Sequence, residues 1–179
     1  MSLQSVTILL DRSSSMAGIN YGQAVAFING ALLTALRENS SLFSKVKIGL
    51  IGFDTDAEWL VKPTKLDGFR TPDVTLVSPF GGACIGPALE CVCQQVVDEP
   101  SYGRHLLVLI SDGFFLDDIF LALEAFSARN DALRLGFGVS ESCANSLAIF
   151  ERWDGGGRVP YRSVIQAASQ DLEAALVSI

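Results

Sequence analysis

An acidic residue and two alternating hydroxyl groups follow the first apolar run of the chain. The stretch DRSSSM begins at Asp11 and places Ser13 and Ser15 two and four residues further on. Hard cations such as Mg²⁺ prefer oxygen ligands, so this grouping fits a metal site. Asp and Ser also build turns and cap helices, so the stretch taken alone also fits an ordinary loop.

Each group of candidate ligands follows a stretch that predicts a buried strand. SVTILL precedes Asp11, and HLLVLI at residues 105–110 precedes SDG, in which the acid is Asp112. The loop GGACIGPAL at residues 81–89 leads into a predicted helix. In open α/β sheets, ligands bind outside the carboxyl ends of the strands, near the point where the strand order reverses. The candidate metal ligands that we expect to meet there are Asp11, Ser13, Ser15 and Asp112.

Strands and helices alternate along almost the whole chain. Apolar runs and turn residues predict strands over residues 6–10, 45–53, 57–62, 105–110, 133–139 and 158–162. Apolar periodicity predicts helices over residues 20–37, 85–98, 118–128, 144–153 and 166–178. Asn20 is expected to cap the first helix, Asp117 or Asp118 the third, and residues 63–83 are expected to be loop-like. This order implies a doubly wound α/β fold, whose mainly parallel central sheet has one antiparallel edge strand and helices on both faces.

Composition limits the classes of partner. The chain has 179 residues, 49% of them apolar, and no linker is visible, so residues 1–179 are expected to form a single domain. The formal net charge is -7 and the 13 basic residues are scattered, which argues against nucleic acid and anionic membranes as partners. No apolar run approaches the ~18 residues of a membrane span, and no basic region precedes the first apolar run. The four cysteines lack the spacing of a disulfide framework, so we expect a cytoplasmic protein.

Other kinds of site are disfavoured by their spacing. An EF-hand wants Gly at its sixth position and Glu at its twelfth, where this chain has Met and Gly. Neither a P-loop nor a G-x-S-x-G elbow occurs, and the one histidine, His105, starts a predicted strand at the wrong edge. A Mg²⁺-dependent phosphohydrolase using Asp11 and Asp112 is the enzyme alternative, although Ser13 stands where a haloacid-dehalogenase-type site has its second Asp. We therefore favour a role other than catalysis.

The three stretches together resemble a known family. DRSSSM resembles the D-x-S-x-S signature of von Willebrand factor A domains, the metal-ion-dependent adhesion site, and GGACIGPAL resembles the family's GGT…AL segment. LLVLISDG resembles the family's later strand with its metal-site Asp. The resemblance implies the Rossmann-like von Willebrand A fold. Among the branches, the chain is similar to the bacterial tellurium-resistance-associated proteins, which suggests partners in a bacterial stress or phosphorylation-linked system.

The resemblance also implies a set of metal ligands. Ser13 and Ser15 would coordinate the metal directly through their hydroxyls, and Asp11 and Asp112 would bind it directly or through water. The implied cation is Mg²⁺, with Mn²⁺ and Ca²⁺ as alternatives, and an Asp or Glu carboxylate of a protein partner would complete its coordination. The family's threonine falls at Ala83, which has no oxygen to offer. This departure leaves basal metal binding open and counts against a switched, high-affinity ligand-bound state.

The predicted function is metal-ion-dependent protein binding by an adhesion or scaffold module. Phe114 and Phe115 directly follow SDG and are either a core plug or an exposed contact; if exposed, they would anchor a protein partner. The loops expected to set specificity are residues 12–20, 79–86 and 113–118. A metal-free scaffold that keeps the fold and has lost the site is a further alternative, beside the phosphohydrolase.

Overall fold

Five strands form a single sheet at the centre of the fold. The computed structural model describes residues 3–38, 45–71, 79–98, 104–140 and 144–151. The strands, in the order β3-β2-β1-β4-β5, have the bounds β3 Ala57–Lys65, β2 Lys47–Phe53, β1 Leu3–Asp11, β4 Arg104–Ser111 and β5 Ala132–Gly138. All neighbouring strands pair in parallel except β2 and β3, which are antiparallel at one edge. The predicted mainly parallel sheet with one antiparallel edge strand is therefore confirmed.

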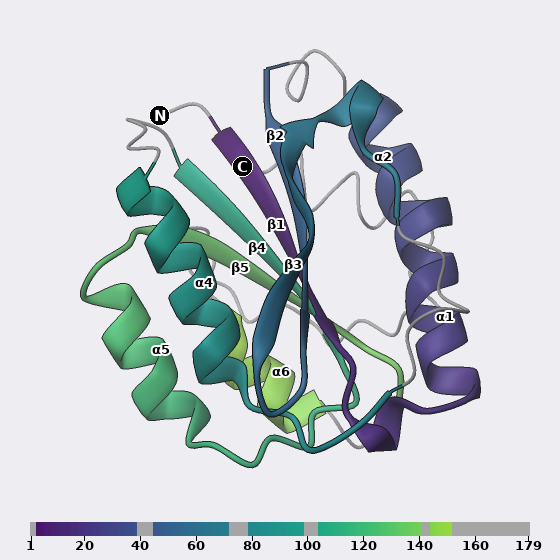
Figure 1. Cartoon of the computed structure of the whole chain (residues 1–179), viewed down its shortest axis with the longest axis vertical. Helices are drawn as coiled ribbons and strands as arrows, with labels where there is room; N and C mark the ends of the chain where they lie inside the picture. Colours follow the sequence, from purple (N-terminus) through teal and green to yellow (C-terminus); the bar gives the residue numbers. More distant parts are fainter. Residues whose placement is uncertain (1–2, 39–44, 72–78, 99–103, 141–143, 152–179) are drawn as a thin grey trace.

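β1 occupies the middle of the sheet because its residues are apolar on both faces. The residues from Val6 to Leu10 are all buried. β1 pairs with β2 on one side and with β4 on the other, so that Leu10 lies between Gly52 and Ile110. The strand order reverses at β1, and the carboxyl ends of β1 and β4 come together at the lower edge of the sheet in Figure 1. This is the position at which open α/β folds bind ligands.

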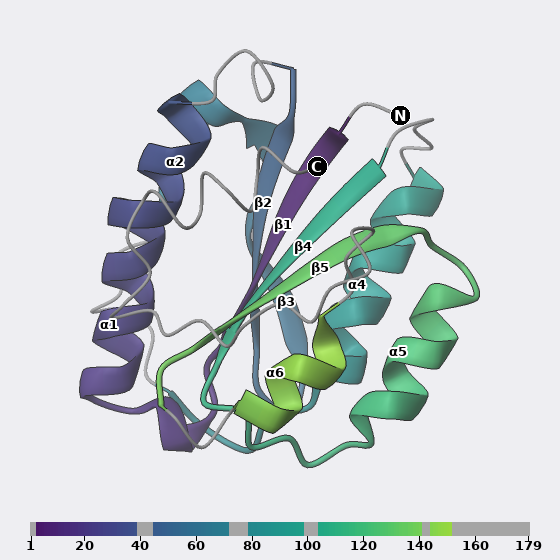
Figure 2. The ribbon, with the colours of Figure 1, turned by 180° about the vertical axis from the view of Figure 1, so that it is seen from behind.

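Helices cover both faces of the sheet (Figure 1, Figure 2). One face carries a single long helical stretch, made of α1 (Ile19–Phe27), a π-helical turn (Ile28–Leu32) and α2 (Leu33–Glu38). The other face carries α4 (Ile85–Asp98), α5 (Ile119–Ser127) and α6 (Ala144–Phe150). Short 3-10 helices are Ser14–Met16 and Leu66–Gly68. Within the described ranges, no helix has both the length and the apolar character that crossing a membrane requires.

Two apolar cores lie on opposite faces of the sheet. Alternate residues of β4 enter different cores, because successive side chains of a strand point to opposite faces. Val108 belongs to the core under α1, whereas Leu107 and Leu109 belong to the core under α4 and α5. The apolar run of β4 thus reflects burial on both sides, and its carboxyl end is held at a fixed position.

A side-chain cap explains where α5 begins, and a glycine turn precedes α1. Asp118 is the N-cap of α5 and accepts hydrogen bonds from the backbone of Phe120 and Leu121. Of the two candidate caps for this helix, Asp117 and Asp118, the second is therefore confirmed. The prediction that Asn20 caps the first helix is wrong. α1 begins at Ile19 after Gly18, whose φ of 79° favours glycine, and Asn20 Nδ2 instead donates to Ser15 O.

The edge strand β3 is longer than expected. It extends to Lys65 and includes Pro63, which the sequence analysis assigned to a loop. A proline is tolerated in an edge strand because its missing N–H faces away from the sheet. The predicted strand at residues 158–162 and the predicted closing helix at residues 166–178 lie outside the described residues. A single domain over the whole chain stays a prediction.

We expect the core under α1 to depend strongly on one aromatic pair. The rings of Phe27 and Phe137 lie 4.7 Å apart between centroids, and Phe137 is 0% exposed. Phe137→Ala should lower the free energy of unfolding by about 3–5 kcal/mol, because it leaves a cavity that the sheet cannot fill. Phe120→Ala, at an exposed position of α5, should change it by less than about 0.5 kcal/mol. Urea denaturation measures both, and similar losses would contradict this account.

Candidate metal centre

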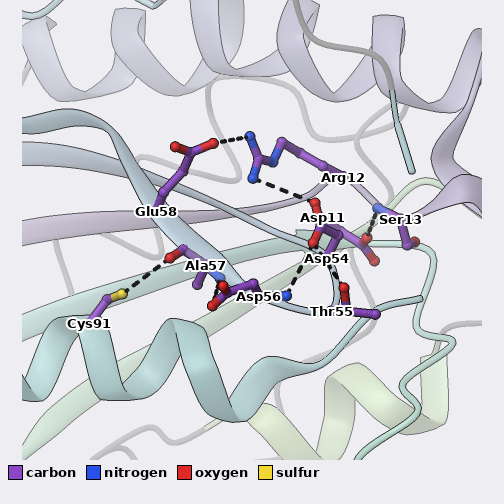
Figure 3. A network of polar contacts seen from close by, with 9 residues as sticks. All are labelled: Asp11, Arg12, Ser13, Asp54, Thr55, Asp56, Ala57, Glu58 and Cys91. Atoms are coloured by element: carbon purple, nitrogen blue, oxygen red, sulfur yellow. Dashed lines mark hydrogen bonds and ion pairs between the residues drawn. The ribbon is translucent and has the colours of Figure 1, made fainter. Parts of the chain in front are cut away.

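Asp11 lies at the end of β1 with its side chain buried. The residue is 0% exposed, yet both carboxylate oxygens accept hydrogen bonds. Oδ1 accepts one from Ser13 N at 2.8 Å, which Figure 3 shows, and Oδ2 accepts one from Ser111 Oγ at 2.6 Å. Ser111 is the last residue of β4, so its hydroxyl joins the ends of two neighbouring strands. The sequence analysis did not assign Ser111 to the site, although it lies directly before Asp112.

The two predicted hydroxyl ligands lie next to each other. Ser13 Oγ and Ser15 Oγ are 3.0 Å apart; Ser13 is buried and Ser15 is exposed. The 3-10 helix Ser14–Met16 produces this arrangement, because Met16 N donates to Ser13 O and the Met16 side chain is fixed in the core. Both hydroxyls therefore reach one place, and one of them is in contact with solvent.

Asp112 comes to the same edge from the end of β4. It is 3% exposed, and its Oδ1 accepts a hydrogen bond from Phe114 N at 3.2 Å. In the described part of the chain, no group donates a hydrogen bond to Asp112 Oδ2. Gly113, with a φ of 80°, turns the chain sharply after this acid. One carboxylate oxygen of Asp112 therefore remains available for a ligand.

The environment of Asp11 disfavours its charge. Burial raises the pKa of the Asp11 carboxyl from its ordinary value of 3.8, hydrogen bonds from Ser111 and Ser13 lower it, and the negative charge of Asp112 raises it further. Burial outweighs the hydrogen bonds, so the pKa is raised. The two acids thus lie close enough to repel each other. A bound cation would offset both the burial and the repulsion.

The donor set fits a hard cation. Two carboxylates and two hydroxyls supply oxygen alone, which suits Mg²⁺, Mn²⁺ or Ca²⁺. Across the ranges that the structure describes, no three His, Cys, Asp or Glu side chains gather as a metal-binding group. A metal here would consequently depend on the hydroxyls of Ser13 and Ser15 as well as on the acids.

Ala83, which the resemblance places at the family's threonine, has an apolar environment. It is 1% exposed, belongs to the core under α4, and forms a parallel β-bridge with Phe115. Its neighbour Cys84 donates its backbone N–H to Asp54 O at 2.7 Å. Burial raises the pKa of the Cys84 thiol, and the charges of Asp117 and Asp54 raise it further. The thiol therefore keeps its proton and does not replace the missing oxygen ligand.

Backbone hydrogen bonds join the loops around the acids. Gly81 O accepts two hydrogen bonds from Ser14, from its N–H and from its hydroxyl, both at 2.9 Å. Phe80 N donates to Arg12 O at 2.9 Å, and Leu116 N donates to Ala83 O at 2.7 Å. These contacts connect the loop after β1 to the loop before α4, and that loop to the segment after β4.

Asp117 fixes the start of α4. Its Oδ1 accepts from Ile85 N at 3.0 Å and its Oδ2 accepts from Gly86 N at 2.7 Å. A carboxylate at a helix N-terminus satisfies free N–H groups and complements the helix dipole. Asp117 therefore ties the segment after β4 to the loop that carries Ala83.

Arg12 is a further residue of this edge that the sequence analysis missed. Its guanidinium donates to Glu58 at 2.8 Å and lies 3.6 Å from Asp54, two acids of the β2–β3 hairpin (Figure 3). The Arg12 Nε is buried without a hydrogen-bond partner. Gly52 makes room for the side chain, since a Cβ there would lie 2.6 Å from Nε. The sequence carries one signal for this arrangement: Gly52 lies two residues before the acidic turn that begins at Asp54, and Glu58 follows that turn.

The two phenylalanines after SDG have different environments. Phe114 is 62% exposed, whereas Phe115 is partly buried and packs against the core under α4. The two interpretations left open by the sequence therefore apply to one residue each. Phe115 is the plug and Phe114 is the exposed contact.

The raised pKa of Asp11 gives the metal-free protein a defined pH dependence. The folded state binds this proton more tightly than the unfolded state, so stability falls as the pH rises from 3.8 through the raised pKa of Asp11. In EDTA at neutral pH, Asp11→Asn should therefore have a higher free energy of unfolding than the unsubstituted protein. The difference should narrow as the pH falls towards 3.8. Urea denaturation over this pH range measures it.

Asp67→Asn is the matched control for charge. Asp67 is exposed and lies in the short helix after β3, so its replacement removes one negative charge without touching the site. An equal gain from both variants at every pH would contradict the argument from burial.

Two glycine substitutions test the position of Arg12. Gly52→Ala should cost about 1–3 kcal/mol of stability, because the new methyl displaces the guanidinium or Leu60. Gly22→Ala, in α1 with no atom within 4 Å of the new methyl, should instead gain up to about 1 kcal/mol. Urea denaturation separates them, and a stabilised Gly52→Ala variant would show that Arg12 moves aside freely.

Comparisons with known proteins agree with this fold. The family model of the von Willebrand factor type A domain matches residues 6–114. Among curated proteins, no sequence matches the chain. Among solved structures, the chain is similar to proximal thread matrix protein 1 from the mussel byssus, with 12% identity and a TM-score of 0.66, over 98% of this chain and 46% of that one.

Two further structures are similar at low identity. The pilus adhesin SpaC from Lactobacillus rhamnosus GG has 15% identity and a TM-score of 0.61, over 99% of this chain and 29% of that one. The VWA domain of SpRpn10 has 11% identity and a TM-score of 0.60, over 94% of this chain and 93% of that one. The chain thus spans less than half of the thread matrix protein and of SpaC. At such identities the likeness shows the fold alone.

The matched segment contains the parts that define the site. It begins in β1, includes the loop with Ser13 and Ser15, and ends at Phe114, just beyond Asp112. Fold, site geometry and family model agree, and the chain belongs to the von Willebrand factor type A domain family.

Proposed function

We propose that this domain is a protein-binding module. It holds a divalent cation at the edge of the sheet where the carboxyl ends of β1 and β4 lie, and the cation binds a carboxylate of the partner. The observation that supports this most is the convergence of Asp11, Ser13, Ser15 and Asp112 at the reversal point of the sheet. Burying acids beside paired hydroxyls costs folding free energy, and this cost has no return unless the groups bind a ligand. A cation makes the arrangement favourable.

The residues present fit such a cation. Ser13 and Ser15 would bind it through their hydroxyls, and Asp11 and Asp112 would bind it directly or through water. Hydrogen bonds from Ser13 N and Ser111 Oγ hold the Asp11 carboxylate in one orientation. When bound, the cation supplies a positive centre that attracts an anionic oxygen of the partner. Mg²⁺ keeps several waters and needs few protein ligands, which suits this short ligand set.

Binding is a better interpretation than catalysis. Asp11 has no exposed surface, so it is poorly placed as a base or nucleophile towards a substrate. Each of its oxygens accepts one hydrogen bond and keeps a second lone pair for a cation or a bound water. His105 lies at the amino end of β4, at the opposite edge of the sheet, where it contacts Ser5. One of the similar structures is a pilus adhesin by name, which also favours binding. We therefore prefer a binding module to the phosphohydrolase.

The substitution at Ala83 favours a second candidate. Without the family's threonine, the domain would lack one oxygen ligand for the cation. The second candidate is therefore a scaffold that keeps the same fold and binds no metal. The tellurium-resistance-associated branch and the cytoplasmic location are further parts of our proposal, based on the resemblance of the sequence and on the lack of a disulfide framework.

Calorimetric titration of metal-stripped protein with Mg²⁺ and then Mn²⁺ tests the cation. We expect saturable binding at one site, abolished in Asp11→Asn and weakened by more than about tenfold in Ser13→Ala. Ser14→Ala is the matched control, because the Ser14 hydroxyl bonds to Gly81 O and is not a ligand. The absence of saturable binding at millimolar metal would contradict the cation site and favour the metal-free scaffold.

A further inference from the structure

In the part of the chain that the structure describes, the large apolar side chains that are exposed all lie at one edge of the molecule, and their exposed fractions are between 62% and 79%. They are Ile19, Phe80, Phe114, Leu116, Phe120 and Leu121. Each belongs to a loop or first helical turn at the carboxyl edge of the sheet. Clustering at one edge marks a binding surface, whereas scattered apolar residues need no explanation.

Four of these side chains lie within the eight consecutive residues 114–121, and we call this exposed segment the α5 platform. It consists of Phe114, Leu116, Phe120 and Leu121. Leu116 also lies over the loop before α4, because a Cβ at Gly82 would come within 2.0 Å of its Cδ1. That loop also carries the exposed Phe80, two residues before Gly82.

The platform is held in place from beneath. Phe115 and Ile119 alternate with the exposed residues and pack against the core under α4. Asp118 accepts hydrogen bonds from the backbone of Phe120 and Leu121. A surface fixed in this way loses little conformational entropy when a partner binds. The exposed side chains are therefore presented by a rigid segment.

The border of the platform is acidic. Residues 113–128 contain no Lys or Arg. Asp118 and Glu124 are exposed within this segment, and Glu124 lies one helical turn after Phe120 and Leu121 on α5. A second copy of this chain would bring like charges together, and each copy carries a net charge of -7. Charge complementarity instead favours a positively charged partner.

We propose that the α5 platform binds a segment of a partner protein in which large apolar side chains are flanked by Lys or Arg. The apolar side chains cover Phe114, Leu116, Phe120 and Leu121, and the basic side chains face Asp118 and Glu124. This inference rests on the proposed role as a protein-binding module, but it does not require the cation. It assigns a surface beside the metal centre and the chemistry of what covers it.

Fluorescence anisotropy in EDTA tests the platform with defined probes. The probes are a labelled amphipathic leucine–lysine peptide, its leucine–glutamate counterpart, and a shuffled leucine–lysine peptide of the same composition. We expect the first to bind more tightly than the other two. The double variant Leu116→Ser/Phe120→Ser should weaken its binding by about tenfold or more. Glu124→Gln should weaken it severalfold and make it less dependent on salt.

Ile19→Ser is the matched control. Ile19 is as exposed as the platform residues and lies at the same edge, but it belongs to α1 on the other face of the sheet. It should leave binding unchanged, and urea denaturation should show that all variants remain folded. Equal binding of the three peptides, or unchanged binding by the double variant, would overturn the proposal.

Two other results would also overturn it. Binding that appears only with Mg²⁺ would assign the peptide to the metal centre. A dimer in sedimentation that the double variant dissociates would show that a second copy covers the platform. Failure of metal binding in the calorimetric test leaves the platform unaffected, so the two proposals fail separately.

Discussion

The burial of Asp11 is the constraint on which the carboxyl edge of the sheet depends. A carboxylate removed from water must be compensated, because an unpaired buried charge costs more than a domain can spare from its small net stability. Here the compensation comes from Ser13 N in the following loop and from Ser111 Oγ in the neighbouring strand. The end of the β1–β4 pair and the path of the first loop are therefore both bonded to the same side chain. The hydroxyls of Ser13 and Ser15 lie together as a consequence of that path.

The loops around Asp11 are stiff because each is bonded to another. Gly81 O takes two hydrogen bonds from Ser14, and the Asp117 carboxylate takes two from the start of α4. Functional residues on such loops need no ordering when a ligand arrives, which lowers the cost of binding. The same bonding turns Phe115 and Ile119 inward, and thereby leaves Phe114 and Phe120 outside.

Local patterns in the sequence predict much of this fold, and the rest depends on contacts between distant residues. The apolar runs of β1 and β4 predict strands buried on both faces, and the acids that follow them predict where the site lies. The Ser111–Asp11 bond joins residues 100 apart, and the Arg12–Glu58 bond joins residues 46 apart. The second of these follows from the register that places Gly52 opposite Glu58, in a pair of strands with irregular pairing. The hydrophobic periodicity of the sequence does not predict such a register. The cap assigned to Asn20 failed for a local reason, since α1 begins one residue earlier, at Ile19 after Gly18.

Ala83 connects the two proposed surfaces. A cation held without the family's threonine has one protein oxygen fewer, so less of a partner's affinity would come from the metal centre. Exposed apolar side chains supply affinity of a different kind, because burying them against a partner stabilises the complex by about 25 cal/mol for each Å² of apolar surface removed from water. Charged groups mainly set orientation and the rate of encounter, while rigid apolar anchors give most of the affinity. A partner that places an acid on the cation and apolar and basic side chains on the α5 platform would meet both demands. The loss of the threonine would then be offset by Phe114, Leu116 and Phe120 at the neighbouring surface.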